Sequence, residues 1–183
     1  AVLGQEADRG HALAQCGVTS LRAGDDYVVE SPSGDDILVR GQDYTALLGV
    51  AVSVSPPPTV PDVPGDLARE EFSTPGVKSI AQIAEFTGLP ATSQIKSLVM
   101  VRDGEPLLVL LRGDHQLSPA KLPGARPAEG DEIRRWFRAG AGSLGPVGVQ
   151  GVAILADEAL RGRRNMIAGA NKNDFHLRHV TPG

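Results

Sequence analysis

The chain has 183 residues, of which 41% are hydrophobic and 22% are charged, and its net charge is −4 at pH 7. No apolar run is long enough to cross a membrane, so the composition predicts a soluble globular protein and excludes a membrane-spanning one. The single cysteine, Cys16, excludes an internal disulfide, and no secretory signal is visible, which together predict a cytoplasmic protein.

Charge is distributed unevenly along the chain. Residues 1–77 contain four basic and twelve acidic residues, a net charge of −8, whereas residues 78–183 carry a net charge of +4. The second part therefore either presents a basic face or is a nearly neutral domain beside an acidic flank. Both interpretations stay open from charge alone.

The first part of the chain divides at its prolines. Residues 1–55 form an acidic flanking segment, in which two short apolar runs at 27–30 and 37–40 predict a β-hairpin. Consecutive prolines from Pro56 onward stiffen the chain and cannot enter a sheet interior, which predicts a linker over 56–72. The remaining residues, 73–183, form the main domain.

Hydrophobic periodicity and turn residues predict the elements of this domain. They are a helix at 77–87 ending at Gly88, strands at 95–102 and 106–112 joined by Asp103-Gly104-Glu105, a short helix begun by Ser118-Pro119, a helix at 129–139, a buried strand at 152–155, a short helix at 157–160 and a strand pair near 165–180. This order predicts an α+β (mixed α/β) fold with a central mixed, mainly antiparallel sheet and flanking helices.

Lys96 stands within the apolar run Ile95–Val101, at the start of a predicted strand. An unpaired ammonium group is costly to bury in a sheet, so a lysine in this position normally holds an anion. The alternative is that the side chain reaches solvent at the edge of the strand.

Three further segments could carry chemistry. They are the charged run 112–115, the glycine-containing loop 142–146, whose backbone N–H groups could approach a ligand closely, and residues 169–176. Each also has a plain structural interpretation as an ion-paired turn or an ordinary loop.

Known catalytic motifs are missing. His176 and His179 are three residues apart in a predicted strand, so they point to opposite faces, and no zinc site is expected. Neither a Gly-x-Ser-x-Gly motif nor a phosphate-binding Gly-Lys-Ser/Thr loop is present. An enzyme of this sequence would therefore polarise its substrate without a covalent nucleophile.

Taken in order, five segments resemble the insertion (editing) domain of bacterial prolyl-tRNA synthetases and the free-standing YbaK/ProX-type aminoacyl-tRNA deacylases. These segments are STPGVKSI at 73–80, IKSL at 95–98, LLRGDHQL at 110–117, GAGSLGPV at 140–147, and AGAN at 168–171 with Phe175-His176. Residues 26–46 are also similar to the synthetase segment that precedes the insertion. The ATP-binding motifs of a synthetase core are not seen, so no activation of proline is expected.

The resemblance implies hydrolysis of mischarged tRNA(Pro) by water, assisted by backbone amides and a substrate hydroxyl. Ala-tRNA(Pro) is the expected substrate, and Cys-tRNA(Pro) is the alternative. It implies that Lys96 holds the terminal adenosine, that the loop Gly142–Pro146 surrounds the aminoacyl group, and that His176 shapes the amino-acid pocket. No cofactor or metal is implied. The partners implied are the acceptor end of aminoacylated tRNA(Pro) and a prolyl-tRNA synthetase, as host chain or as partner.

The candidate residues follow from these implications. The candidate catalytic residues are Lys96, Gly145, as an oxyanion donor, and His176. The candidate substrate-binding residues are Gly142, Ser143, Leu144, Pro146, Gly169, Asn171, Arg112, Asp114 and His115. A basic cluster of Arg161, Arg163, Arg164, Lys172 and Arg178 either meets tRNA phosphates or is an ordinary solvated face. The alternatives to a deacylase are a non-catalytic module that binds tRNA or a synthetase, and a structural fragment of a synthetase.

Overall fold

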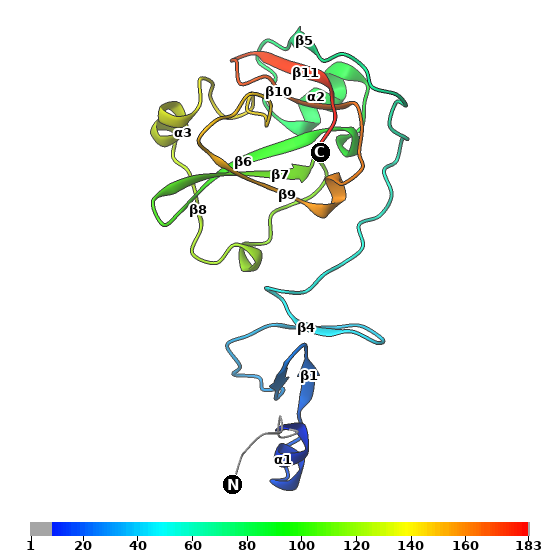
Figure 1. The fold of residues 1–183 in the computed structure, drawn as a ribbon, viewed down its shortest axis with the longest axis vertical. Helices are drawn as coiled ribbons and strands as arrows, with labels where there is room; N and C mark the ends of the chain where they lie inside the picture. The colour runs from blue at the N-terminus through cyan, green and yellow to red at the C-terminus, as the bar shows by residue number, and fades with distance from the viewer. Residues whose placement is uncertain (1–8, 183) are drawn as a thin grey trace. The chain divides into compact units, whose positions relative to one another are not determined.

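The computed structural model describes residues 9–182, which form two compact units (Figure 1). The first unit contains the chain up to Val54 together with Ser118–Pro123, and the second contains Ser55–Leu117 and the chain from Gly124 onward. No helix within residues 9–182 is long and apolar enough to span a bilayer.

The first unit is built from short elements. Helix α1 (Arg9–Gln15) precedes two antiparallel ladders, β1 (Leu21–Ala23) with β2 (Asp26–Val28) and β3 (Leu38–Arg40) with β4 (Thr45–Leu47). The 3₁₀ helix η2 (Pro119–Lys121) confirms the short helix predicted to begin with a proline, although Ser118 makes no side-chain cap.

The predicted hairpin between 27–30 and 37–40 is wrong, because each of these segments pairs with a nearer strand. Strands β1 and β2 are joined by Gly24 and Asp25 alone, and the φ of Gly24 is 66°, a conformation that suits glycine. A two-residue loop costs less entropy to close than the longer connection between the predicted strands.

The main sheet of the second unit has the order β8-β6-β7-β9. Strands β6 (Ile95–Arg102) and β7 (Glu105–Arg112) confirm the predicted central hairpin. Its turn residues Asp103 and Gly104 both have positive φ, of 55° and 83°, as a tight two-residue hairpin requires. Strand β8 (Arg126–Pro127) pairs antiparallel with β6, whereas β9 (Ala153–Ala156) pairs parallel with β7, so the sheet is mixed and mainly antiparallel, as predicted.

Strand β9 does not have the buried environment predicted from its apolar sequence. It lies at the edge of the sheet, where Ile154 and Leu155 remain 42% and 41% exposed. An apolar run alone does not distinguish an edge strand from a central one, which is why the prediction is wrong.

A second, three-stranded antiparallel sheet has the order β10-β11-β5. Strands β10 (Met166–Gly169) and β11 (Phe175–Val180) confirm the predicted final strand pair. Strand β5 (Glu70–Ser73) is not predicted from the sequence, because acidic residues such as Glu70 and Glu71 are depleted in strands. In the ladder Glu70 is the partner of Arg178, so the acidic residue meets an opposite charge across the pair.

Helix α2 (Ile80–Thr87) begins three residues later than predicted, because Ser79 caps it. The Ser79 hydroxyl accepts from the N–H of Gln82, and the Gln82 amide oxygen accepts from the N–H of Ser79, which forms a capping box. Gly88 ends the helix in the left-handed conformation, as predicted.

The other helical elements are short. Helix α3 (Gly130–Trp136) stops before the end of the predicted helix at 129–139, because the backbone is extended at Phe137. The 3₁₀ helix η3 (Glu158–Leu160) confirms the prediction at 157–160, and a further one, η1 (Ala91–Ser93), precedes β6.

The core of the second unit lies between its sheets and determines which way β6 faces. Ile95 and Val99 of β6 belong to this core, together with Leu108, Leu110, Phe137, Leu144, Leu160, Met166 and Val180. Because side chains alternate along a strand, Ser97 shares the core-facing side with Ile95 and Val99, whereas Lys96 lies on the opposite side.

Residues 55–69, here called the strap, have no regular secondary structure but belong to the second unit. They are bonded to it at several points. The Pro56 carbonyl accepts from Arg112, the hydroxyls of Thr59 and Thr92 lie 3.1 Å apart, Asp62 pairs with Arg163, and the Asn165 amide donates to the carbonyls of Val63 and Gly65.

Candidate functional site

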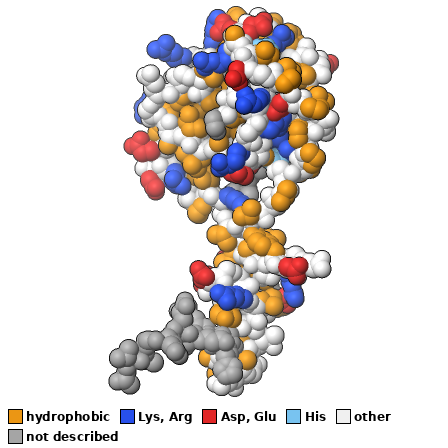
Figure 2. Space-filling model, turned by 45° about the vertical axis from the view of Figure 1, so that its right-hand side comes forward, with side chains coloured by type: hydrophobic (Ala, Val, Ile, Leu, Met, Phe, Trp, Pro, Cys, Tyr) orange, Lys and Arg blue, Asp and Glu red, His pale blue; other side chains and the backbone are white. Residues whose placement is uncertain are grey.

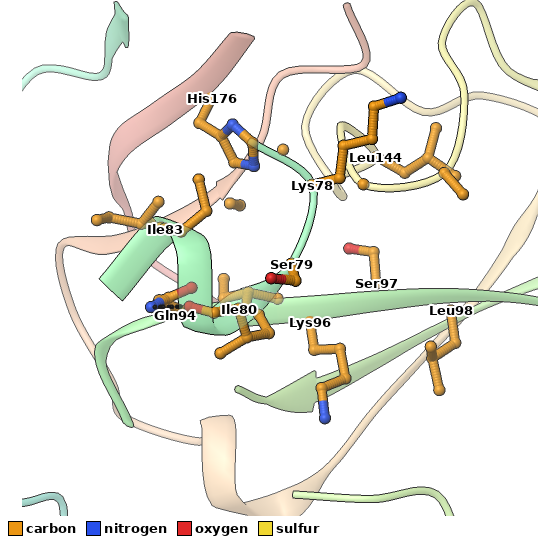
Figure 3. Close-up of a pocket in the computed structure, with 16 residues that line it drawn as sticks. Lys78, Ser79, Ile80, Ile83, Gln94, Lys96, Ser97, Leu98, Leu144 and His176 are labelled. Carbon is orange, nitrogen blue, oxygen red and sulfur yellow. Dashed lines mark hydrogen bonds between the residues drawn. The ribbon is translucent and has the colours of Figure 1, made fainter. Parts of the chain in front are cut away.

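A cavity of about 280 Å³ opens beside the first residues of β6 and the first turn of α2 (Figure 3). Strands β10 and β11 and the loop at 141–144 complete its lining. Its apolar lining includes Ile80, Ile83, Leu144 and Ile167, and its polar lining includes Lys78, Ser79, Gln94, Ser97 and His176. Of the described residues that line it, none carries a carboxylate, so the cavity is neutral apart from its lysines.

His176 closes one side of the cavity from β11. It is only 5% exposed, and its Nδ1 lies 2.7 Å from the hydroxyl of Thr74, the residue that follows β5. Burial lowers the pKa of the His176 imidazole, and the backbone of Gly142 acts in the opposite direction. The imidazole is therefore neutral at pH 7, and the cavity presents it as an uncharged wall.

Two close contacts of the loop opposite His176 require glycine: that of Gly142 with Lys78, and that of Gly145 with Gly169. A Cβ on Gly142, whose φ is 96°, would lie 2.7 Å from the Cβ of Lys78. A Cβ on Gly145 or Gly169 would overlap the backbone of the other segment, because the loop and β10 pack main chain against main chain. The loop therefore lies against β10 with no side chain between them.

Asn171 fixes this loop in place. Its amide oxygen accepts from the Gly145 N–H at 2.9 Å, and its amide nitrogen donates to the carbonyls of Gly145 and Val147. The hydroxyl of buried Ser143 accepts from the N–H of Asp174. Asn171 and Ser143 thus hold the loop in place without lining the cavity themselves. The Gly145 N–H, which is predicted as an oxyanion donor, already donates to Asn171 in this conformation.

Two other backbone N–H groups of the loop, unlike that of Gly145, remain available to a ligand. Within residues 9–182, the N–H groups of Gly142 and Leu144 have no protein acceptor, and both residues line the cavity. Of the predicted substrate-binding residues, Gly142, Leu144 and Gly169 line the cavity, whereas Pro146 is not among its lining residues.

Lys96 also lines the cavity, but its side chain points away from His176, on the opposite side of β6 from Ser97 (Figure 3). Its ammonium group donates to the backbone carbonyl of His115. Burial lowers the pKa of this ammonium, while the charge of Asp114 acts in the opposite direction. Lys96 and His176 therefore lie on different sides of the site.

A charged network lies at the end of β7, next to the ammonium group of Lys96. Arg112 is only 2% exposed and binds both carboxylate oxygens of Asp114, at 2.7 and 2.8 Å, as well as the carbonyl of Pro56. The Nδ1 of His115 lies 2.8 Å from a carboxylate oxygen of Asp157. The structure thus brings Arg112, Asp114 and His115 close to Lys96, in a network whose members pair with one another.

The five residues of the predicted basic cluster are each engaged within the chain. Arg161 pairs with Glu158, Arg163 with Asp62, Arg164 with Asp66 and Lys172 with Glu71, and Arg178 lies over the Phe72 ring at 4.4 Å. Positive and negative side chains are accordingly interspersed on the visible face of the second unit in Figure 2. This pattern fits the ordinary solvated face better than a phosphate-binding surface.

Several polar residues at the site were not identified from sequence, namely Thr74, Lys78, Ser79, Gln94 and Ser97. Within the described chain, Ser97 Oγ and Gln94 Oε1 are buried and have no hydrogen-bond partner. Strand alternation contains the signal for Ser97, since it must lie on the opposite side from Lys96, but only the fold shows which side holds the cavity. No group of three His, Cys, Asp or Glu side chains in residues 9–182 is placed to hold a metal ion.

Comparison with known proteins identifies relatives of this sequence. Residues 74–183 match the family model described as an aminoacyl-tRNA editing domain. The proline–tRNA ligase of Acidobacterium capsulatum is 34% identical over 196 residues, covering 93% of this chain and 34% of the ligase. That of Streptococcus pyogenes serotype M1 is 37% identical over 160 residues, covering 82% and 26%. The chain spans about a third or less of the length of these curated relatives.

The fold agrees with this match. A solved structure of a candidate trans-editing enzyme for prolyl tRNA synthetase has a TM-score of 0.54 and 24% sequence identity, covering 62% of this chain and 76% of that one. The α+β fold predicted from the sequence is confirmed, as is the resemblance to an editing domain.

Proposed function

Because residues 74–183 make this chain a member of the aminoacyl-tRNA editing domain family, related to the editing of prolyl-tRNA synthetase, we propose that it hydrolyses the ester bond of mischarged tRNA(Pro). Its substrate in this proposal is Ala-tRNA(Pro). The observation that carries the proposal is the small cavity, lined by no carboxylate, between α2, the loop at 141–144 and His176.

Discrimination by size supports alanine as the target. A synthetase that accepts proline cannot exclude the smaller alanine sterically, because one missing methylene group gives only about 1–3 kcal/mol of discrimination. A second and smaller pocket that hydrolyses whatever enters it solves this problem. The apolar side chains of Ile80 and Ile83, facing a neutral His176, provide such a pocket for a methyl side chain.

The proposed chemistry is attack by water on the ester carbonyl carbon, followed by departure of the ribose oxygen, which takes up a proton. The products are a free amino acid and uncharged tRNA. The cavity lining contains no carboxylate to act as a base, so a neighbouring ribose hydroxyl of the substrate positions the water. The N–H groups of Gly142 and Leu144, rather than that of Gly145, stabilise the developing oxyanion.

Lys96 has a positioning role in this proposal. Its desolvated ammonium group exchanges the His115 carbonyl for an acceptor on the terminal adenosine when the substrate binds. Arg112, Asp114 and His115 then act through Lys96, by holding the segment that carries its resting acceptor. The partner is the acceptor end of tRNA(Pro), presented by a proline–tRNA ligase that is either the host chain or a separate protein.

The direct test is deacylation. The protein is incubated with Ala-tRNA(Pro), Cys-tRNA(Pro) and Pro-tRNA(Pro), and release of the amino acid is followed over time. We expect Ala-tRNA(Pro) to be hydrolysed and Pro-tRNA(Pro) to remain intact. Faster hydrolysis of Cys-tRNA(Pro) would show that cysteine, and not alanine, is the target. If folded protein hydrolyses none of the three substrates, the proposed deacylase activity is refuted.

A second candidate is a non-catalytic module that binds the acceptor end of tRNA. The observation in its favour is that Asn171 occupies the Gly145 N–H, the donor expected from the sequence. Such a module would bind aminoacylated tRNA in a filter or fluorescence assay and slow its spontaneous hydrolysis. Acceleration of hydrolysis over the uncatalysed rate excludes this candidate.

A further inference from the structure

Two lysines line the cavity, and their environments differ. The ammonium group of Lys96 is half-buried and donates to the His115 carbonyl. Lys78 is exposed, and within residues 9–182 no acidic side chain pairs with its ammonium group. In Figure 3 the two side chains extend in opposite directions, with the hydroxyls of Ser79 and Ser97 between them.

The backbone of Lys78 is held firmly at the edge of the cavity. Its N–H donates to the amide oxygen of Gln82 at 3.0 Å, the same oxygen that accepts from Ser79 in the capping box of α2. Gly142 packs so closely that any Cβ there would meet the Cα and Cβ of Lys78 at 2.9 and 2.7 Å. The start of the lysine side chain is thus fixed, while its ammonium end is free to meet a ligand.

The other cations considered for the RNA are less suitable. Lys172 precedes β11 and Arg178 lies within it, but Glu71 pairs with Lys172 and the Phe72 ring lies against Arg178. Arg163 is buried in its pair with Asp62. A phosphate that bound these groups would have to displace an existing partner, whereas at Lys78 it would displace only water.

We propose that Lys78 binds the phosphodiester that joins the terminal nucleoside of the tRNA to its neighbour. This inference rests on the proposed function and adds to it the contact that anchors the RNA backbone. In an aminoacylated RNA end, that phosphodiester is the anion nearest to the ester bond, while the amino acid itself contributes a cation. A lysine on a flexible four-carbon stem suits a phosphate as a point charge.

The test compares two esters that differ by one nucleotide and its phosphodiester. The first substrate is the alanyl ester of adenosine, which has no phosphate, and the second is the alanyl ester of the dinucleotide cytidylyl-adenosine. Deacylation of both is measured with the full chain and with the variants Lys78→Gln and Lys78→Arg. The control variant is Arg102→Gln, which removes one exposed positive charge at the far end of β6.

We expect Lys78→Gln to raise the KM for the dinucleotide ester about threefold to fivefold with little change in kcat, and to leave the adenosine ester unaffected. The slope of log(kcat/KM) against log salt should fall by about 0.7, the value for one contact with a single strand. Lys78→Arg should restore most of the affinity, and Arg102→Gln should change neither ester.

The proposal is overturned if Lys78→Gln affects both esters equally, affects neither, or matches Arg102→Gln. Wild-type protein that hydrolyses neither ester refutes the proposed function instead. In that case, binding of the dinucleotide without its alanyl group, measured by fluorescence titration, tests the phosphate contact of Lys78 separately. An unchanged dissociation constant in Lys78→Gln would overturn the phosphate contact, and a weakened, less salt-dependent one would support it.

Discussion

Two groups of polar residues near the start of β6 differ in how completely they are paired. In the network next to the Lys96 ammonium, Arg112 binds Asp114 and His115 lies against Asp157. In the cavity, the Ser97 hydroxyl has no partner in the described chain, and the imidazole of His176 is buried in neutral form. The first group is a completed structural network, and the second retains groups that a ligand can use.

This difference changes how the residues around Lys96 are understood. Charged residues attract attention in a sequence, yet here most of them stabilise the fold by pairing with one another. The groups that the cavity offers are backbone N–H groups, hydroxyls and a neutral imidazole, which a list of charged residues does not reveal. Lys96 connects the network with the cavity, because it lines the cavity while its ammonium belongs to the network.

The largest effect is expected where the cavity wall is packed main chain against main chain. In Gly169→Ala, the new Cβ would overlap the backbone of Ser143 and Leu144, so the free energy of unfolding should fall by about 3–4 kcal/mol. Urea denaturation measures this. Gly140→Ala is the matched control, since its Cβ would make only an ordinary contact with Asn173. A loss below about 1 kcal/mol in Gly169→Ala would show that the loop can move away from β10.

The next effect concerns the charged network at the end of β7. Arg112→Ala leaves the Asp114 carboxylate and the Pro56 carbonyl without their donor, so the free energy of unfolding should fall by about 2–3 kcal/mol. Arg102→Ala, at an exposed position, should change it by less than about 0.5 kcal/mol. Equal effects in the two variants would contradict the structural role of the network.

A substitution of Lys96 tests whether this residue serves the cavity or the charged network. Lys96→Met removes the ammonium but keeps much of the side-chain volume, so deacylation should fall at least about tenfold, which corresponds to about 1.4 kcal/mol. The free energy of unfolding should change by less than about 1 kcal/mol, because the lost hydrogen bond is offset by relief from desolvation. Full activity with reduced stability would instead assign Lys96 to the structural network.

The smallest effect is a pH dependence caused by His176. Its pKa is lowered in the folded protein, so below the unfolded value of about 6.5 the unfolded state binds more protons than the folded state. The stability that His176 contributes is therefore complete above this pH and is lost as the pH falls below it. Denaturation of wild type and His176→Gln between about pH 7.5 and 5.5 should show a smaller decline in the variant, and parallel declines would contradict the prediction.

Local sequence signals predicted much of the fold, where they were strong. The β6–β7 hairpin follows from two apolar runs around Asp103-Gly104, and the end of α2 follows from Gly88. Strand pairing in the first unit and the exposure of β9 could not be predicted, because both depend on which segments come together in space. The same limit applies to β5, which becomes a strand only by pairing with β11.

Only part of the cavity lining is among the residues that the sequence singled out. The resemblance identified Lys96, Gly142 and His176, all of which line one cavity. The partners of the basic cluster were not visible, because Asp62 and Arg163 are about a hundred positions apart in the sequence. Nor does the sequence show that Asn171 uses the Gly145 N–H, since that bond depends on how the loop packs on β10.

The strap has a practical consequence for how this domain can be excised. A recombinant fragment cut to the family match at residue 74 would lack Asp62 and would leave the guanidinium of Arg163 buried without its carboxylate. It would also lose β5, which forms one edge of the second sheet. A fragment that keeps both the strap and β5 starts near Ser55, well upstream of the start of the family match.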